Sequence, residues 1–440
     1  MENQKSFRQL LMPIFFETLL LTLAGIVDTL MLSTVSDNAV GAVGTANTYI
    51  SVFIIMFGIV TTGMTAVMTQ NIGANKPGIA YQARQISLYF NGVLGVVFSL
   101  SIGFFSKNIL EMVGIAPALI VPADEYLKPV GWFVFLNALI PVFSGYLRAF
   151  GYSKQSLTAA LIANGVNLVL NAVSLFILKW GVFGVALATV ISRVVNLLIL
   201  IIQSFVYIHA KSDTNRLDGK IVFGQIIKVG LPGAFENTLW NVEILLVTRF
   251  LNQMDTDGLN VTARSYQMQI SNFSYCMGYA ISQANAIVAG WKIGENKLDE
   301  CDRGTKKASI YGILSAVIVS AFFALCSSLI MRIFSNDREI ISLVQKLLLI
   351  DIALEMGKVT NLIYGTALKT SGDAVFPAIL GIVFMYLCGV LGAYIFGIKL
   401  GLNAIGVMIG LALDEIVRAC GMFLRWKSGK WRKKLLVSAK

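Results

Sequence analysis

The chain has 440 residues, of which 56% are hydrophobic and only 13% are charged, and its net charge is +11. Soluble domains carry about 25% charged residues, so this composition excludes an ordinary soluble domain. The sequence is that of an integral membrane protein.

Apolar runs of roughly 20 residues, the length that crosses a hydrocarbon core of about 30 Å, recur along the whole chain. The first run starts close to Met1 and is too long for the apolar part of a cleaved signal peptide, so we expect it to remain as a helix. Runs of this length also argue against lipid-facing strands. In chain order, twelve transmembrane helices are predicted at 10–35, 44–72, 87–106, 129–149, 156–178, 182–208, 226–251, 265–291, 308–331, 342–368, 375–396 and 402–425.

Short motifs recur half a chain apart and in phase with one another. The offset is 219 residues for the first pair (236 − 17) and 221 for the other two (294 − 73 and 368 − 147), which is far longer than a solenoid repeat. The matches predict two equivalent halves of six helices each. The pairs are Pro13–Glu17 with Pro232–Glu236, Ile72–Lys76 with Ile293–Lys297, and Leu147–Gly151 with Leu368–Gly372.

A polar segment at 209–225 is predicted to be a cytoplasmic linker between an N-terminal lobe, 1–208, and a C-terminal lobe, 226–440. Because each lobe has an even number of helices, both share one orientation, related by an axis along the membrane normal. Lysine and arginine gather in the turns on the N-terminal side and in the basic tail, so both termini are expected in the cytoplasm. This topology explains the net charge, and no nucleic-acid partner is expected. The opposite side has only Lys107, Lys128, Lys179, Arg332, Arg338, Lys346 and Lys399.

Several motifs resemble those of one transporter family. The run Gly25–Thr29 resembles the first-helix signature of multidrug and toxic compound extrusion (MATE) transporters, and the turns Leu147–Gly151 and Ala367–Asp373 resemble the repeated "LRG" turns of that family. The Pro-Phe-Glu pattern is most similar to members from Gram-positive bacteria. The resemblance covers the whole chain and implies an all-α fold, in which two pseudo-symmetric six-helix bundles surround a central cavity.

The resemblance also implies a function. MATE transporters carry out multidrug efflux by secondary active antiport, exporting lipophilic and often cationic compounds in exchange for Na+ or H+. We therefore expect a multi-pass protein of the plasma membrane that is not an enzyme and has no cofactor besides the coupling ion. Its expected partners are small compounds and membrane lipids, and nothing in the sequence demands more than a monomer.

Asp28 lies about 18 residues into the first predicted helix, roughly 27 Å along its axis, in the outer half of the bilayer. An intramembrane carboxylate is costly and is a functional candidate. Asn167 and Asn171 share one face of the fifth helix with Asn164, at about 18 Å and about 24 Å from its inner end. Thr189 in the sixth helix falls at a similar depth. Carboxylate, amide and hydroxyl oxygens suit Na+, or a proton relay if the aspartate protonates.

The resemblance assigns cation coupling to these four residues, Asp28, Asn167, Asn171 and Thr189, which would be the metal ligands if the ion is Na+. Some family members have an aspartate where this chain has Asn171, so a single carboxylate remains and the ion preference stays open. The alternative is that the amides and the hydroxyl only hydrogen-bond neighbouring helices. Tyr126 is expected either to cap the site or to anchor the chain at the membrane interface.

Glu17 lies about 16 Å from Asp28 on the same helix face, and Glu236 repeats it in the second half. These glutamates are expected either to attract cations at a cavity entrance or to pair with nearby lysine or arginine. The position that would repeat Asp28 is Val247, so the ion site is not duplicated.

The tenth predicted helix has a lysine, Lys358, where some family members have an aspartate. Asp351, Glu355 and Lys358 share one helix face, and a lysine at this depth needs an acidic partner. The candidate partners are Glu355 and, on the seventh predicted helix, Glu243 or Glu236. The interpretations are a structural ion pair or a proton- or substrate-gated switch. The residues assigned to the substrate cavity are Glu17, Glu236, Glu243, Glu355 and Lys358.

Two other groups of residues carry less functional weight. Asp414, Glu415 and Arg418 are predicted to form a local salt-bridge cluster near the end of the last helix. The five cysteines all lie in the second half, show no metal or disulfide spacing, and are expected to be free thiols.

Two alternative functions remain for a membrane protein of this kind. A lipid-linked oligosaccharide flippase of the same superfamily would have a strongly basic cavity, whereas intramembrane acids outnumber bases in this sequence. A membrane-embedded transferase presents paired acidic motifs on a loop, and Asp37, Asp255 and Asp257 are too sparse for that role. Cation-coupled efflux is therefore the preferred hypothesis.

Overall fold

The computed structural model of this chain describes residues 5–112, 115, 117–209, 217–254, 258–334 and 337–437, apart from the side chains of residues 37, 333 and 334. Within these residues every regular element is helical. Packing divides the chain into two compact units, 1–230 and 231–440. Residues 210–216 of the predicted linker, and the loop acids Asp255 and Asp257, lie outside the described residues.

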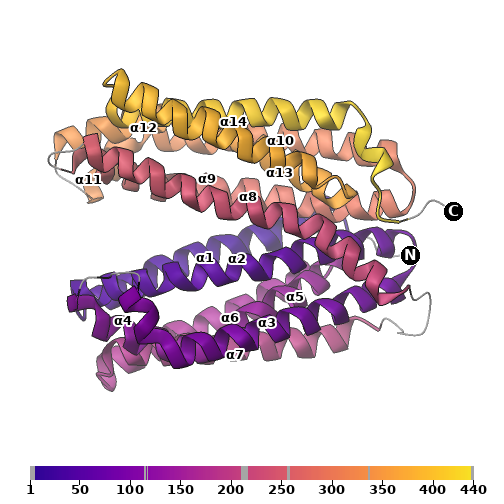
Figure 1. The fold of residues 1–440 in the computed structure, drawn as a ribbon, viewed down its shortest axis with the longest axis horizontal. Coiled ribbons are helices and arrows are strands. Elements are labelled where there is room, and N and C mark those ends of the chain that lie inside the picture. Colours follow the sequence, from indigo (N-terminus) through magenta and orange to yellow (C-terminus); the bar gives the residue numbers. More distant parts are fainter. Residues whose placement is uncertain are drawn as a thin grey trace. The chain divides into compact units, whose positions relative to one another are not determined.

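The first unit contains the helices of the first six predicted spans (Figure 1). Within it α1 packs against α6, and α3 packs against α2, α4 and α5. The elements are α1 (Phe7–Ser33), α2 (Asp37–Gly73), α3 (Pro77–Met112), α4 (Pro117–Trp132), α5 (Phe135–Ala149), α6 (Ser153–Ala172), the π-helical turn η1 (Val173–Ile177) and α7 (Gly181–Tyr207).

The fourth span differs from its prediction at 129–149. It begins at Pro117, and its two helices α4 and α5 meet at an angle of 52°. At the break, the backbone N–H of Phe135 donates to the hydroxyl of Ser99 on α3, at 3.0 Å. This side-chain acceptor satisfies a donor that the break would leave without a partner. The interruption lies in an apolar stretch, so hydropathy alone could not reveal it.

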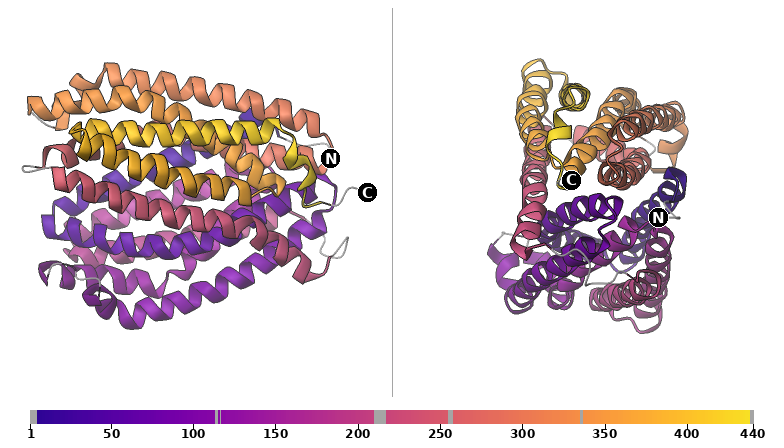
Figure 2. Two further views of the ribbon diagram at one scale, coloured as in Figure 1. Left: turned by 45° about the horizontal axis from the view of Figure 1, so that its top comes forward. Right: turned by 90° about the vertical axis from the view of Figure 1, so that its right-hand side faces the viewer.

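The second unit begins inside α8 and contains the remaining spans. α12 is its central helix, in contact with α9, α10 and α14, and these helices lie side by side in Figure 1 and Figure 2. The elements are α8 (Gly219–Met254), α9 (Leu259–Gly294), α10 (Leu298–Leu325), α11 (Ser327–Phe334), α12 (Arg338–Ser371), α13 (Val375–Phe384), the π-helical turns η2 (Met385–Val390) and η3 (Ala393–Lys399), α14 (Asn403–Lys427) and the 3-10 turn η4 (Lys430–Lys433).

Counting each interrupted helix as one span gives twelve spans in the described part of the chain, as predicted. Among the residues that the structure describes, seven helices are apolar and long enough to cross a membrane on composition and length alone, or eight if α4 and α5 are one span. α8, α9, α12 and α14 fall outside that group because polar and charged side chains interrupt their apolar sequence. These four helices build the polar interior of the second unit.

The end of α14 is fixed by a pair of buried tryptophans. Trp431 in η4 stacks on Trp426 with ring centroids 4.3 Å apart, and its indole N–H donates to the Trp426 carbonyl at 3.1 Å. The indole N–H of Trp426 donates to Asp302 on α10 at 2.8 Å. Both rings belong to one apolar cluster that joins α9, α10, α12 and α14. The basic tail is thus folded onto the bundle as far as Val437.

We expect Trp431→Ala to destabilise the second unit, because it empties a site where the side chain is only 1% exposed. Large-to-alanine changes of this kind cost about 3 kcal/mol or more. The measurement is the thermal unfolding midpoint of the purified protein in detergent. Lys433→Ala, which changes an exposed residue of the same turn, is the control and should leave the midpoint unchanged. Equal midpoints for Trp431→Ala and the parent protein would contradict the expectation.

Candidate functional site

Asp28 and two asparagines form a hydrogen-bonded group in the first unit. The Asn171 amide on α6 donates to the Asp28 carboxylate on α1 at 2.8 Å, and to the Asn167 side-chain oxygen at 3.1 Å. Asn171 is fully buried, Asn167 is nearly so, and Asp28 is half-buried. The π-helical turn η1 follows directly after α6, and such turns often mark functional sites. The face predicted from the asparagine spacing therefore does meet Asp28.

Thr189 and Tyr126 make their hydrogen bonds elsewhere. The Thr189 hydroxyl donates to the Val185 carbonyl of its own helix at 2.9 Å. The Tyr126 hydroxyl donates to the side-chain oxygen of Asn47 at 3.3 Å. Among the described residues, neither of them is hydrogen-bonded to Asp28. The structure thus joins three of the four residues assigned to cation coupling.

One acceptor at this group has no partner. The side-chain oxygen of Asn171 is buried and receives no hydrogen bond from any described residue. Buried polar atoms normally have partners, so this oxygen next to the Asp28 carboxylate fits a site that takes a proton-bearing group or a hard cation. The oxygens that would hold Na+ are those of Asp28, Asn167 and Asn171, with Thr189 as the predicted fourth.

Glu17 lies further along α1. It accepts a hydrogen bond from the Ser156 hydroxyl of α6 at 3.0 Å, while its second carboxylate oxygen is buried without a hydrogen-bond partner. No lysine or arginine among the described residues forms an ion pair with it. The predicted alternative of a local ion pair therefore does not apply to Glu17 in this structure.

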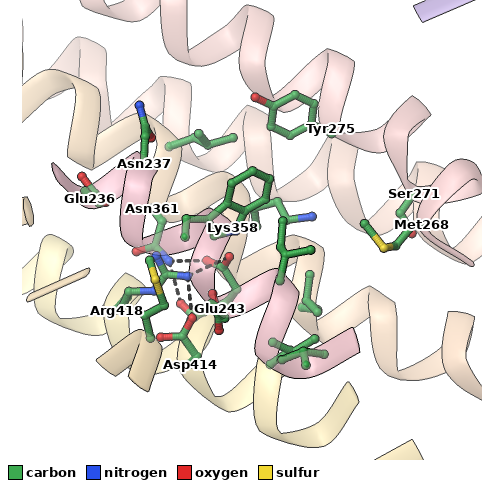
Figure 3. Close-up of a pocket in the computed structure, with 18 of the residues that line it drawn as sticks. Glu236, Asn237, Glu243, Met268, Ser271, Tyr275, Lys358, Asn361, Asp414 and Arg418 are labelled. Atoms are coloured by element: carbon green, nitrogen blue, oxygen red, sulfur yellow. Dashed lines mark hydrogen bonds and ion pairs between the residues drawn. The ribbon is translucent and has the colours of Figure 1, made fainter. Parts of the chain in front are cut away.

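The second unit has a partly open cavity of about 460 Å³, lined by residues of α8, α9, α12, α13, η2 and α14 (Figure 3). Acidic and basic side chains both face it, which sets it apart from a purely acidic or purely basic pocket. The carboxylates are Glu236, Glu243, Asp351, Asp414 and Glu415, and the basic groups are Arg264, Lys358, Lys369 and Arg418.

Most of these charges are paired within the cavity wall. Lys369 on α12 donates to Glu236 on α8 at 2.7 Å. Arg418 contacts both Asp414, at 2.5 Å, and Glu415, at 2.9 Å, so the cluster predicted on the last helix is present and faces the cavity. These pairs hold the wall together and leave little net charge on it.

Lys358 is paired with the fully buried Glu355 behind it. Next to this pair, Asp351 accepts hydrogen bonds from the Gln267 amide, at 2.8 Å, and from the Ser271 hydroxyl, at 2.6 Å. Glu236 and Glu243, the other candidate partners of the lysine, form no ion pair with it in the described structure. The intramembrane lysine thus has the acidic partner that its depth requires.

Two glycines of the α13 span make room for the two glutamates of α8. A Cβ atom at Gly381 would lie 2.8 Å from the Glu236 carboxylate, and one at Gly389 would lie 2.2 Å from that of Glu243. Real Cβ contacts are essentially never shorter than 3.0 Å. The two glutamates are seven residues apart on α8, and the two glycines are eight residues apart on the opposite span. Each carboxylate therefore packs against a glycine, where the backbone carries no side chain.

Both halves of the chain match one protein family, described as MatE, over residues 13–173 and 232–395. The chain belongs to the MatE family. The matched segments begin at Pro13 and Pro232, the prolines of the first repeated motif. The family predicted from the repeats and motifs is therefore confirmed.

Relatives match nearly the full length of this MatE chain. "Uncharacterized transporter YisQ" of Bacillus subtilis is 32% identical over 428 residues, which cover 96% of this chain and 94% of the relative. "Probable multidrug resistance protein NorM" of Thermotoga maritima is 24% identical over 452 residues, covering 99% and 95%. Relatives from Bacillus species bear out the resemblance to members from Gram-positive bacteria. This MatE protein is a membrane-embedded transporter.

Solved structures share the MatE fold. One, described as the outward-facing conformation of a multidrug resistance MATE family transporter of the MOP superfamily, has a TM-score of 0.88 at 20% identity, covering 96% of this chain and 94% of that one. Another, of a MOP superfamily transporter from Pyrococcus furiosus whose binding pocket is described as reversed in polarity, has a TM-score of 0.84 at 19% identity, with the same coverage. The predicted all-α fold is confirmed.

Sequence reasoning missed several residues that line the cavity of this MatE protein. Arg264 lay just outside the predicted span 265–291, but α9 begins at Leu259, so the arginine is inside the helix. Gln267 and Ser271, which bind Asp351, are ordinary polar residues with no sequence signal of their own. Gln267 and Ser271 follow Arg264 by three and seven residues, which places all three on one face of a helix. This spacing is the sequence pattern that could have identified the polar face.

Proposed function

We propose that this chain is a secondary active antiporter that exports lipophilic, often cationic compounds across the plasma membrane in exchange for Na+ or H+, with both termini in the cytoplasm. The observation that carries the proposal is the Asp28 carboxylate, held inside a spanning helix by Asn171 beside an amide oxygen without a partner. A carboxylate at such depth persists where it serves a function. The named multidrug resistance relatives support export as the direction of transport.

The proposed mechanism is alternating access with antagonistic binding. Substrate enters while the protein is open to the cytoplasm, and uptake of the coupling ion at Asp28 favours the state that releases it. A ligand shifts a conformational equilibrium only by its differential affinity for the two states. Uptake of the coupling ion neutralises the Asp28 carboxylate and changes its hydrogen bond with Asn171. Because this hydrogen bond joins α1 to α6, the change can give the two conformational states different affinities for the ion.

The test uses purified protein in liposomes loaded with a lipophilic cationic dye such as ethidium. Dye movement is measured with an imposed Na+ gradient alone, with a proton gradient alone, and after collapse of each gradient by an ionophore. We expect one of the two gradients to drive transport and its collapse to stop it. Dye movement that ignores both gradients, or that equals the leak of empty liposomes, would overturn the proposal.

We expect Glu17→Gln and Glu236→Gln to weaken transport of cationic substrates more than of neutral ones, since we propose that each of these negative charges attracts cationic substrates as they enter. The KM for a cationic dye should rise about fivefold for Glu17→Gln, a loss of ~1 kcal/mol. The rise should be at least as large for Glu236→Gln, because that change also leaves the positive charge of Lys369 without its ion-pair partner. The measurement is the concentration dependence of dye efflux. Equal losses for cationic and neutral substrates would contradict the entrance role.

A further inference from the structure

The first unit has an open groove of about 340 Å³ between the first turns of α1 and α6. We propose that this groove binds one anionic phospholipid, with Arg8 and Lys154 at its phosphate and an acyl chain along Met12 and Phe16. The groove contains none of the residues assigned to the substrate or to the coupling ion. The inference is therefore independent of the proposed export function.

The charged side chains that line the groove are all basic. Arg8 lies in the first turn of α1 and Lys154 in the first turn of α6, and no acidic residue lines the groove with them. Both side chains are exposed, and neither forms an ion pair within the described residues. Their charges are therefore available to an anion that sits between the two helices.

A third basic residue adds to this charge. The Lys5 ammonium lies 5.0 Å from the centroid of the Tyr152 ring, in the residue that precedes α6. Burial and the nearby charge of Lys154 both lower the pKa of Lys5. Lys5, Arg8 and Lys154 thus form a basic cluster in which like charges repel one another. An anion bound among them would relieve this repulsion.

The basic cluster occurs in one half of the chain only. The positive-inside rule counts basic residues near the ends of spans and does not require them to surround one groove. The cluster therefore needs an explanation that is specific to the first unit. At the offsets of the repeated motifs, 219 for α1 and 221 for α6, the matching residues of the second half carry no charge: Gly224 (5 + 219), Ile227 (8 + 219) and Val375 (154 + 221).

Beyond the basic cluster the groove is apolar. Met12 and Phe16 of α1, which are 47% and 44% exposed, line it together with Leu157 of α6. Exposed apolar side chains continue along both spanning helices, at Leu23 on α1 and Leu161 on α6. A soluble anion makes no use of such a wall, whereas an acyl chain lies along it. Basic pockets between spanning helices on the cytoplasmic side are typical sites for anionic lipid headgroups.

A lipid in the groove bridges two helices that already meet there. Glu17 on α1 and Ser156 on α6 are hydrogen-bonded at 3.0 Å, and they are the sequence neighbours of the lining residues Phe16 and Leu157. A phosphate held by Arg8 and Lys154 adds a second link between the same helices. Because a ligand that binds only the folded state stabilises it, the anionic lipid should raise the thermal unfolding midpoint.

The test titrates the purified full-length protein in a neutral detergent with phosphatidylglycerol and counts the bound lipid by native mass spectrometry. Each basic residue near a lipid surface is worth about fivefold in affinity, so the double variant Arg8→Gln with Lys154→Gln should bind about 25-fold more weakly than the parent. Phosphatidylcholine, which has no net charge, should not distinguish the two proteins. The matched control, Lys307→Gln, neutralises an exposed lysine of α10 and should bind phosphatidylglycerol as the parent does.

Two further measurements identify the ligand and the role of charge. Phosphatidylglycerol should raise the unfolding midpoint of the parent, whereas glycerol phosphate, which has no acyl chain, should not. The variant Arg8→Lys with Lys154→Arg keeps both charges and should retain the lipid. Equal affinity of the parent and the double Gln variant for phosphatidylglycerol would overturn the proposal, as would equal affinity of the parent for phosphatidylcholine. Equal stabilisation by glycerol phosphate would show a site for soluble phosphate and would overturn the lipid assignment. None of these measurements involves transport, so their outcome is separate from that of the export test.

Discussion

Asp28→Asn is expected to abolish gradient-driven export, with a fall in coupled transport of about a hundredfold or more, which corresponds to ~2.7 kcal/mol. An amide neither binds nor releases a proton at any physiological pH, and it brings no negative charge to Na+. The oxygen of an asparagine side chain can still accept the hydrogen bond from Asn171, so the packing of α1 against α6 should survive. The measurement is dye efflux from liposomes under the gradient that drives the parent protein.

Two measurements separate loss of coupling from loss of folding. The thermal unfolding midpoint of Asp28→Asn should stay close to that of the parent, and substrate should still bind in the absence of a gradient. Glu111→Gln makes the same chemical change at an exposed carboxylate and should leave efflux unaltered. Full gradient-driven efflux by Asp28→Asn would show that the coupling group lies elsewhere.

The fold was predictable because the membrane imposes long apolar runs and the duplication repeats its motifs at fixed offsets. Twelve spans and two halves follow from those two patterns alone. The bend between α4 and α5 did not follow, since the Ser99 hydroxyl that supports it belongs to another helix and the interrupted stretch is apolar. Apolar runs report which residues can face lipid, but they do not report how the backbone is interrupted inside the bundle.

The candidate site was predictable where spacing along one helix carries the information. Asn167 and Asn171 share a face by their separation, and depth along the helices places them near Asp28, which the structure bears out. Thr189 was matched by depth and by the family resemblance, and neither determines where its hydroxyl finds an acceptor. Residues that meet across helices, such as Glu243 against Gly389, require the packing of α8 against the α13 span to be known.

The basic residues of the second-unit cavity bear on how the alternative functions compare. The sequence suggested that intramembrane acids outnumber bases, which disfavoured a flippase with a basic cavity. The structure brings four basic groups to the cavity of the second unit, but three of them are in ion pairs with acids. A cavity whose charges largely cancel differs from a strongly basic one, so the flippase gains no support from this lining.

Gly389→Ala is expected to impair transport as strongly as Glu243→Gln, although it changes no charge. The added methyl group would lie 2.2 Å from the Glu243 carboxylate, which is too close for any real contact. The obstructed atom is the end of a flexible side chain, so the carboxylate should swing away while the helices stay in place. The KM for an amine-bearing substrate should rise about tenfold, which is ~1.4 kcal/mol. The measurement is the concentration dependence of efflux.

The matched control for this substitution is Gly304→Ala on α10, where a Cβ atom meets nothing within 4 Å. That change should leave transport intact and stabilise the helix by about 0.5–1 kcal/mol, as alanine does in place of glycine. The double variant Gly389→Ala with Glu243→Asp shortens the acid and should recover part of the lost affinity. An unchanged KM for Gly389→Ala would show that substrate does not depend on the position of the Glu243 carboxylate beside Gly389. If Glu243→Asp did not lower the KM of Gly389→Ala, the effect of Gly389→Ala would instead come from helix packing. Shortening the acid can restore transport only if the added methyl group acts by displacing the carboxylate.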